Sequence, residues 1–246
     1  MLISVETLTK GFGVRPNGVL HVGAHDGEEA LNYSKYGWGP VIWVEMLPDK
    51  YEALRTRFEA DPENSVLNAA CWDVDGLQLP LFRASNGESS SLLKPQEHLI
   101  SHPRITFARQ EGIATSRLDS ILPANARFDY ISLDIQGAEL RALLGMGVWL
   151  PKVKWACIEI NTRRLYEGCA MLNELDAYLN EQGFVRLITK MAGNKGWGDA
   201  VYVNSNLISP GALRLLKRKA RLWQAMNFVL NAPKLLRVNS FLRRLR

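Results

Sequence analysis

The sequence predicts an α/β fold with a seven-stranded, mostly parallel sheet and an antiparallel hairpin at one edge. Two observations predict it. Short apolar runs alternate with segments of helical periodicity along most of the chain, which is typical of a parallel sheet covered by helices on both faces. The last two apolar runs flank a glycine-rich loop with no helix between them, which is typical of an antiparallel pair.

Local signals bound each expected element. The expected strands are residues 18–23, 40–46, 65–72, 128–135, 153–160, 184–189 and 199–204. The expected helices are residues 28–36, 51–58, 137–146 and 172–182. Gly37 and Gly183 end the first and the last of these helices, because glycine is favoured just after a helix.

The charge is divided unevenly between two parts of the chain. Residues 210–246 contain ten basic residues and no acidic residue, which leaves 20 basic and 25 acidic residues in residues 1–209. The body therefore has a formal net charge of −5, whereas the whole chain has +5. We expect one domain at residues 1–209 and a basic, amphipathic helical extension at residues 210–246.

Composition and cysteine usage favour an ordinary globular protein of a reducing compartment. Hydrophobic residues make up 47% of the chain and charged residues 22%. The cysteines Cys71, Cys157 and Cys169 are odd in number, and the first two lie in apolar stretches. No signal-peptide pattern opens the chain and no apolar run has transmembrane length, so we expect a cytoplasmic protein.

Carboxylates follow most of the expected parallel strands. They are Glu45, Asp73, Asp134 and Glu159. Each one alone could cap a helix or face solvent. The carboxyl ends of parallel strands meet at one edge of the sheet, however, and ligands bind there. The set as a whole therefore predicts a ligand site.

The turn after the first strand, VLHVGAHDGEEA at residues 19–30, favours a cofactor with a ribose but without a pyrophosphate. Gly23 and Gly27 have three residues between them, and the bulky His25 stands where a dinucleotide turn needs a glycine close to the phosphates. Glu45 follows Gly23 by 22 residues, the spacing at which an acid accepts hydrogen bonds from both hydroxyls of a ribose. S-adenosylmethionine fits this description.

A series of motifs between about residues 19 and 204 resembles the FkbM-type S-adenosylmethionine-dependent methyltransferases. The motifs are VLHVGAHDGEEALNY, VIWVEMLPDKYEAL, NAACWDVDG, SSSLLKP, SRLDSIL, DYISLDIQGAELRALLGM, IEI and GDAVYVN, in that order. The resemblance implies a seven-stranded, Rossmann-like class I methyltransferase fold. It also implies transfer of a methyl group to a hydroxyl oxygen of a sugar, glycolipid or polyketide.

The resemblance also implies roles for the residues of the first turn. Gly23, Ala24 and Gly27 would wrap the amino-acid end of S-adenosylmethionine, with His25 facing the cofactor. The chain departs from the general methyltransferase pattern at His21, where an acid usually contacts the cofactor ammonium. We interpret His21 as a buried structural imidazole.

Further roles follow from the other strand ends. The resemblance implies that Glu45 holds the ribose, that Asp73 reaches the adenine amine, and that Asp134 and Glu139 lie near the transferring methyl group. A sugar hydroxyl needs a general base near neutral pH, and His25, Asp134 and Glu139 are the candidates. Glu139 has an alternative role, which is to stabilise the N-terminus of its helix.

A metal-assisted mechanism is the alternative to a side-chain base. Asp134, Glu159 and Asn161 offer the oxygen ligands that a hard cation prefers. No second acid stands beside Asp134, and His21 and His25 do not share a helix face. We therefore expect no metal site.

The acceptor is expected to contact two segments, residues 85–104 and 190–200. Trp197 could stack on a sugar face or simply pack within its own hairpin. His98 and His102 are four residues apart and are expected at the surface.

The basic extension begins with a helix-start signal, Ser209 followed by Pro210. One face of the expected helix is mostly apolar and comprises Leu213, Leu216, Ala220, Trp223, Asn227 and Leu230. Pro233 ends the helix, and the following sequence KLLRVNSFLRRLR is again basic and rich in apolar residues.

A basic amphipathic helix favours peripheral contact with an anionic membrane, at the inner face for a cytoplasmic protein. The alternatives are packing on the domain or on a second subunit, as in a homo-oligomer. The acidic body disfavours specific nucleic-acid binding.

Two function classes follow. The first is an S-adenosylmethionine-dependent O-methyltransferase whose acceptor is a hydroxyl-bearing small molecule or glycan, such as a lipid-linked saccharide. The second is a non-catalytic binding or scaffold protein on the same fold, recruited through its basic tail. The presence of Glu45, Asp73 and Asp134 together favours the enzyme.

Overall fold

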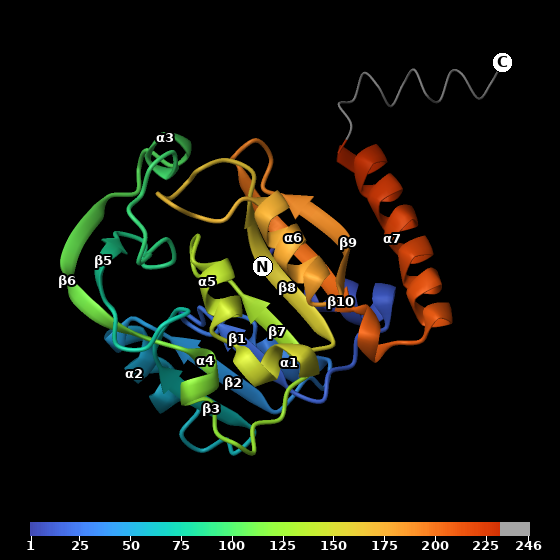
Figure 1. The fold of residues 1–246 in the computed structure, drawn as a ribbon, viewed down its shortest axis with the longest axis horizontal. Helices are drawn as coiled ribbons and strands as arrows, with labels where there is room; N and C mark the ends of the chain where they lie inside the picture. Colours follow the sequence, from blue (N-terminus) through green and yellow to red (C-terminus); the bar gives the residue numbers. More distant parts are fainter. Residues whose placement is uncertain (232–246) are drawn as a thin grey trace.

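The computed structural model describes residues 1–231 and confirms the α/β architecture. Its main sheet has seven strands in the order β3-β2-β1-β7-β8-β10-β9 (Figure 1). The strands are β1 (Val19–Val22), β2 (Val41–Glu45), β3 (Asn64–Asn68), β7 (Tyr130–Leu133), β8 (Trp155–Asn161), β9 (Phe184–Met191) and β10 (Trp197–Asn204). The first five pair in parallel, whereas β10 runs antiparallel to both β8 and β9. This is the predicted sheet with its antiparallel edge hairpin.

Helices cover both faces of this sheet. One face packs against α4 (Leu118–Ile121), α5 (Glu139–Leu144), the 3-10 helix η2 (Gly147–Lys152) and α6 (Leu172–Glu181). The other face packs against the π-helical η1 (Thr7–Phe12), α1 (Ala30–Lys35), α2 (Pro48–Arg57) and α7 (Pro210–Asn231). Successive residues of a strand point to opposite faces. Accordingly, Leu20 packs in the first core and Val19 in the second.

A second, three-stranded sheet lies beside the main one and corrects the prediction for residues 65–72. Its order is β4-β6-β5, formed by Ala70–Cys71, Phe107–Ser116 and Gln78–Ala84 (Figure 1). The third strand of the main sheet ends at Asn68, and the next residues leave it to pair with β6. The Asn68 amide donates to the carbonyl of Glu45 at 2.8 Å, at the point where the chain leaves the main sheet. The sequence does not show where the chain changes sheets, because the residues on either side of the change, Leu67 and Ala70, are both apolar.

The loop between β5 and β6 spans residues 85–106 and includes α3 (His98–Ser101). It lies at the carboxyl edge of the main sheet because Ser91 donates its hydroxyl to the Gln136 carbonyl, just after β7, at 2.8 Å. Gln96 and His98 donate their backbone N–H groups to Leu165. The loop is thereby tied down over the strand ends where the ligand site was predicted.

The C-terminal helix α7 begins where the sequence predicts. Ser209 accepts a hydrogen bond from the Ala212 backbone N–H at 3.2 Å and so caps the helix. The short 3-10 helix η3 (Ser205–Leu207) connects it to β10. The repeated basic segment after Pro233 lies outside the described residues. None of the helices within residues 1–231 combines the length and the apolar composition of a transmembrane span.

Candidate functional site

The turn after β1 is fixed by a glycine that no other residue can replace without movement. Gly23 has φ +85°, and a Cβ added there would lie 1.8 Å from the Asp134 carbonyl oxygen. Its N–H donates to the Val44 carbonyl at 2.9 Å, which ties the end of β1 to β2. Gly23 lines the cavities described below, whereas Ala24 and Gly27 do not. Ala24 and Gly27 shape the turn, since the Gly27 N–H donates to the Ala24 carbonyl at 2.7 Å.

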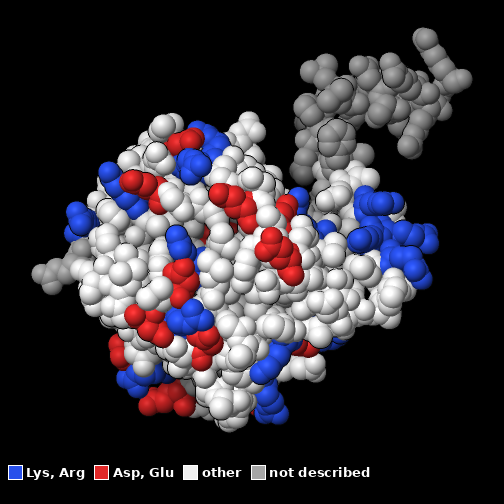
Figure 2. Space-filling model, in the orientation of Figure 1, with Lys and Arg blue, Asp and Glu red and all other residues white. Residues whose placement is uncertain are grey.

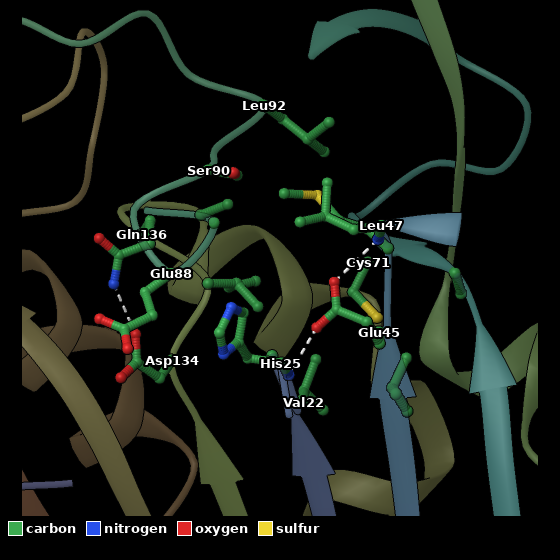
Figure 3. A pocket seen from close by; sticks show the side chains of 17 residues that line it. Val22, His25, Glu45, Leu47, Cys71, Glu88, Ser90, Leu92, Asp134 and Gln136 are labelled. Atoms are coloured by element: carbon green, nitrogen blue, oxygen red, sulfur yellow. Dashed lines mark hydrogen bonds between the residues drawn. The ribbon is translucent and has the colours of Figure 1, made fainter. Parts of the chain in front are cut away.

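His25 connects this turn to Glu45 through its backbone (Figure 3). It has a left-handed conformation with φ 45°, and its N–H donates to Glu45 Oε2 at 2.7 Å. The imidazole Nδ1 lies 3.0 Å from Glu28 Oε1. Its Nε2 is buried and has no hydrogen-bond partner within the described part of the chain. The histidine therefore offers one free polar atom next to the cavity.

Glu45 ends β2 as a buried carboxylate held by the backbone. Its Oε1 accepts the Leu47 N–H at 2.8 Å, and its Oε2 accepts the His25 N–H. Burial raises the pKa of this carboxyl above its ordinary value, and the two backbone hydrogen bonds oppose that shift. Ala69, Cys71 and Leu92 supply apolar surface to the same narrow pocket. A carboxylate beside an apolar wall suits a ribose that carries a flat base.

Beyond Glu45, two carboxyl groups and an amide form a cluster that the sequence only partly indicated. The Gln136 amide nitrogen donates to Asp134 Oδ1 at 2.7 Å and to Glu159 Oε2 at 2.6 Å. Tyr166 donates its hydroxyl to Gln136 Oε1 at 2.8 Å. Gln136 has φ 57°, a conformation that is uncommon outside glycine. The cluster is thus assembled from three separate segments around one amide.

Glu159 is the more deeply buried acid of this cluster. Burial, and secondly the neighbouring Asp134 charge, raise its pKa well above the ordinary value. Two carboxyl groups this close cannot both ionise without a large electrostatic penalty. The surroundings of Glu159 therefore favour its protonated form.

Glu139 lies behind the cluster rather than in the cavity. Its Oε1 accepts the backbone N–H groups of Ile135 and Gly137, both at 3.0 Å. It is 1% exposed and is absent from the lining of both cavities, and burial raises its pKa to about 7. These contacts match its alternative role at the helix N-terminus. They also fix the backbone on either side of Gln136.

Asp73 is likewise held apart from the cavity. It pairs with Arg141 at 2.7 Å and does not line the pocket that contains Glu45. The reason is the change of sheet at residues 69–70, which moves Asp73 beyond the end of β3. Cys71, two residues earlier, lines the pocket instead.

His21 is a buried histidine of the second core. Its Nδ1 lies 3.0 Å from the Tyr33 hydroxyl, and its ring packs on Trp43 with centroids 5.0 Å apart. Burial lowers the pKa of the imidazole. Its edge nevertheless reaches the larger cavity, where Glu29 is a neighbour.

The larger cavity has a volume of about 470 Å³ and adjoins the narrow pocket. The two share Gly23, His25, Glu88, Asp134 and Gln136 as lining residues. The larger one extends to His98, His102, Lys195 and Trp197, which come from the two segments predicted to contact an acceptor. His98 is 3% exposed, contrary to the expectation of a surface residue. The tertiary fold buries it because Tyr166 and Phe107 pack against its ring.

Several residues that line the cavities or lie next to them were missed as site residues. Glu88 stands in a serine-rich loop and Tyr166 in a loop after β8, and neither has a sequence signal of its own. Gln136 could have been found, because it directly follows the strand-end Asp134 within DIQG. Asp199 lies opposite Glu159 in the β8–β10 register because an antiparallel strand begins at the edge where parallel strands end.

The ligand atoms of His25, Asp26 and Glu28 lie within 4.8 Å of one another. Lys50 occupies both oxygens of Asp26, at 2.8 and 2.7 Å, and so competes with a cation there. The absence of a metal requirement stays a prediction.

Comparison with known proteins assigns the class. The family described as "Methyltransferase FkbM domain" matches residues 21–186, more than half of the chain. This chain therefore belongs to the FkbM methyltransferase family, as the motifs predicted. Its sheet order and mostly parallel strands are those of a class I methyltransferase domain.

One curated relative is the 2-O-methyltransferase NoeI of Sinorhizobium fredii (strain NBRC 101917 / NGR234). It is 26% identical over 162 residues, which cover 61% of this chain and 65% of that protein. The chain thus matches just under two thirds of the relative's length. Among solved structures, a SAM-dependent methyltransferase from Aquifex aeolicus matches with a TM-score of 0.48 and 14% identity, covering 82% of this chain and 90% of that one. Magnesium protoporphyrin IX methyltransferase from Synechocystis PCC 6803 with bound SAH matches with a TM-score of 0.48 and 11% identity, covering 82% and 80%.

S-adenosylmethionine is the cofactor of this methyltransferase domain. The residues present fit it. Gly23 leaves room where a Cβ would meet backbone, Glu45 offers a carboxylate already oriented by two N–H groups, and His25 Nε2 is a buried polar atom without a partner. The individual roles of Gly23, His25, Glu45 and Asp134 toward the cofactor stay predictions.

Proposed function

We propose that this protein is an O-methyltransferase that transfers the methyl group of S-adenosylmethionine to a hydroxyl of a sugar, glycan or lipid-linked saccharide. The observation that carries the proposal is the carboxyl cluster of Asp134 and Glu159. Asp134 lines both cavities, and Glu159 lines the larger one. The cluster therefore adjoins both the predicted cofactor pocket and the cavity large enough for an acceptor.

Residues 1–209 would form the catalytic domain and residues 210–246 the basic extension. We also propose the cytoplasm as the compartment, because the three cysteines are buried free thiols.

Asp134 is the proposed general base. S-adenosylmethionine supplies a methyl group on a sulfonium, which is a good leaving group, so the protein must mainly orient the acceptor and remove its proton. Burial favours the protonated form of Glu159, so we assign the role of proton acceptor to Asp134. The Gln136 amide, fixed by Tyr166, keeps Asp134 aimed at the cavity.

The remaining lining suits a polyhydroxylated acceptor. Burial lowers the pKa of His98 to about 4, and burial followed by Lys195 lowers the pKa of His102. Both imidazoles are therefore neutral near pH 7, and a neutral imidazole both donates to and accepts from hydroxyl groups. Trp197 adds an aromatic surface of the kind that packs on a sugar ring. The similarity to a 2-O-methyltransferase supports oxygen as the atom that is methylated.

The test measures transfer of labelled methyl to a panel of nucleotide sugars, glycans and glycolipids. For an acceptor found in this way, Asp134→Asn should lower kcat by about 10²–10⁴, the contribution of a general base. Calorimetry should show that its Kd for S-adenosylhomocysteine changes by less than about tenfold.

Two variants of the same cavity separate the candidate bases. Glu159→Gln should retain most activity, because Gln resembles the protonated acid. His25→Asn should do so too, because Asn tolerates the left-handed backbone and keeps the N–H donated to Glu45. A larger loss of kcat in Glu159→Gln than in Asp134→Asn would assign the base to Glu159. Failure of the wild type to bind S-adenosylhomocysteine would favour the scaffold function instead.

A further inference from the structure

The apolar face that the sequence assigns to α7 is used within the molecule. Leu216 and Ala220 are 7% and 4% exposed, and they pack in the second core with Leu213 and Trp223 beside them. The helix lies against β9 and η1. A lipid surface could therefore meet only the opposite, outward face of α7.

The outward face has two adjacent strips. One is cationic and consists of the exposed Arg214, Lys217, Arg218 and Arg221. The other is apolar and consists of Leu215, Leu222 and Met226, which are 54%, 63% and 62% exposed. At 3.6 residues per turn, the two strips lie side by side along the helix. We call these seven residues the outer face of α7.

The cations of the outer face are not neutralised by the rest of the molecule. The helix contains no acidic residue, and none of the ion pairs among the described side chains, those of residues 1–109 and 112–227, involves these four cations. Figure 2 shows the blue side chains gathered over α7, with no red among them. The outer face is thus a concentrated positive surface on a body whose formal charge is negative.

We propose that the outer face of α7 docks on an anionic lipid bilayer. A bilayer interface meets both strips at once, because anionic headgroups attract the cations and the acyl boundary accepts exposed apolar side chains. A nucleic-acid backbone would engage the cations but leave Leu215, Leu222 and Met226 in water. A second copy packed through this face about a twofold axis would bring like charges together.

The test is flotation of the full chain with vesicles of phosphatidylcholine alone or mixed with phosphatidylglycerol. Wild type should float with the anionic vesicles only, and raised salt should release it because salt screens exposed charges. Each cation near such a surface strengthens binding about fivefold. The variant R214Q/K217Q/R218Q/R221Q should therefore bind roughly several hundredfold more weakly. L215N/L222N/M226N should weaken binding while leaving its salt dependence in place.

A matched control removes the same charge elsewhere. K35Q/R55Q/R127Q/K152Q neutralises four exposed cations of the body and should float like wild type. Circular dichroism melts and S-adenosylhomocysteine binding would check that each variant is folded. Equal weakening by the two charge variants would mean that only net charge matters and would overturn the proposal. So would undiminished binding of the α7 charge variant, or tighter binding of wild type to single-stranded RNA than to anionic vesicles.

Discussion

Glu45→Gln is a direct test of the cofactor pocket, because the substitution keeps the shape of the side chain and removes one acceptor oxygen. In the wild type each carboxylate oxygen accepts one backbone N–H, from Leu47 at 2.8 Å and from His25 at 2.7 Å. A glutamine can serve only one of these donors, and its NH₂ group must face the other. The same oxygens are the predicted acceptors for the two ribose hydroxyls.

The substitution affects both the stability of the fold and the binding of the cofactor. For folding, a buried N–H left without an acceptor costs about 1–3 kcal/mol. Removal of the buried charge offsets part of this cost, because burial raises the Glu45 pKa and so disfavours the ionised form in the folded state. For binding, one hydrogen bond between a ribose hydroxyl and a charged carboxylate is lost, worth about 1.5–3 kcal/mol. The Kd for S-adenosylhomocysteine should therefore rise about 10- to 150-fold, with a smaller loss of stability.

Calorimetry and urea unfolding measure the two quantities separately. The control is Glu52→Gln, an exposed acid of α2 paired with Arg55, which should change neither. A folded Glu45→Gln protein whose Kd stays within about twofold of wild type would show that Glu45 does not hold the ribose.

Three further predictions concern the turn, the buried acid and metal dependence. Gly23→Ala should abolish S-adenosylhomocysteine binding, because the added Cβ collides with the Asp134 carbonyl. It should also lower Tm by more than Gly76→Ala, since Gly76 has φ +74° but no atom within 4 Å of the added Cβ. Equal Tm shifts for the two variants would contradict the collision at Gly23. Because Glu139 has its pKa raised to about 7, its contribution to stability is complete below its ordinary pKa of 4.5 and is lost as the pH rises through about 7. Urea unfolding should thus show a decline of up to about 1.4 kcal/mol per pH unit across that window, and Glu139→Gln should reduce the decline; an unchanged slope would count against this assignment. Methyl transfer should survive EDTA, and a loss restored by added Mg²⁺ would point to a metal-assisted reaction.

The order of strands and helices was predictable because it depends on local patterns. The apolar runs at β1, β2, β7 and β8, and each strand of the β9–β10 hairpin, are visible within about ten residues of sequence. The second sheet was not predicted. Its strands β5 and β6 are amphiphilic and partly exposed, so they lack the continuous apolar character that marked the others.

The candidate site shows the same division. Glu45 and Asp134 could be predicted as site residues from their positions at strand ends, because parallel topology alone brings such residues to one edge of the sheet. The positions of Asp73 and Glu139 depended on contacts distant in sequence or on local backbone geometry. Asp73 forms an ion pair with Arg141, and Glu139 accepts hydrogen bonds from the N–H groups of Ile135 and Gly137.

The sequence by itself therefore determined the fold class, the family and the edge of the sheet at which the candidate site lies. Periodicity and motif order are properties of neighbouring residues, so they survive without coordinates. Only the tertiary structure decided which polar groups meet. Gln136 joins Asp134 to Glu159, and α7 turns its tryptophan face inward and its cations outward. The physical reason is that such pairings follow from the packing of whole elements, and packing brings together residues whose separation in sequence carries no signal.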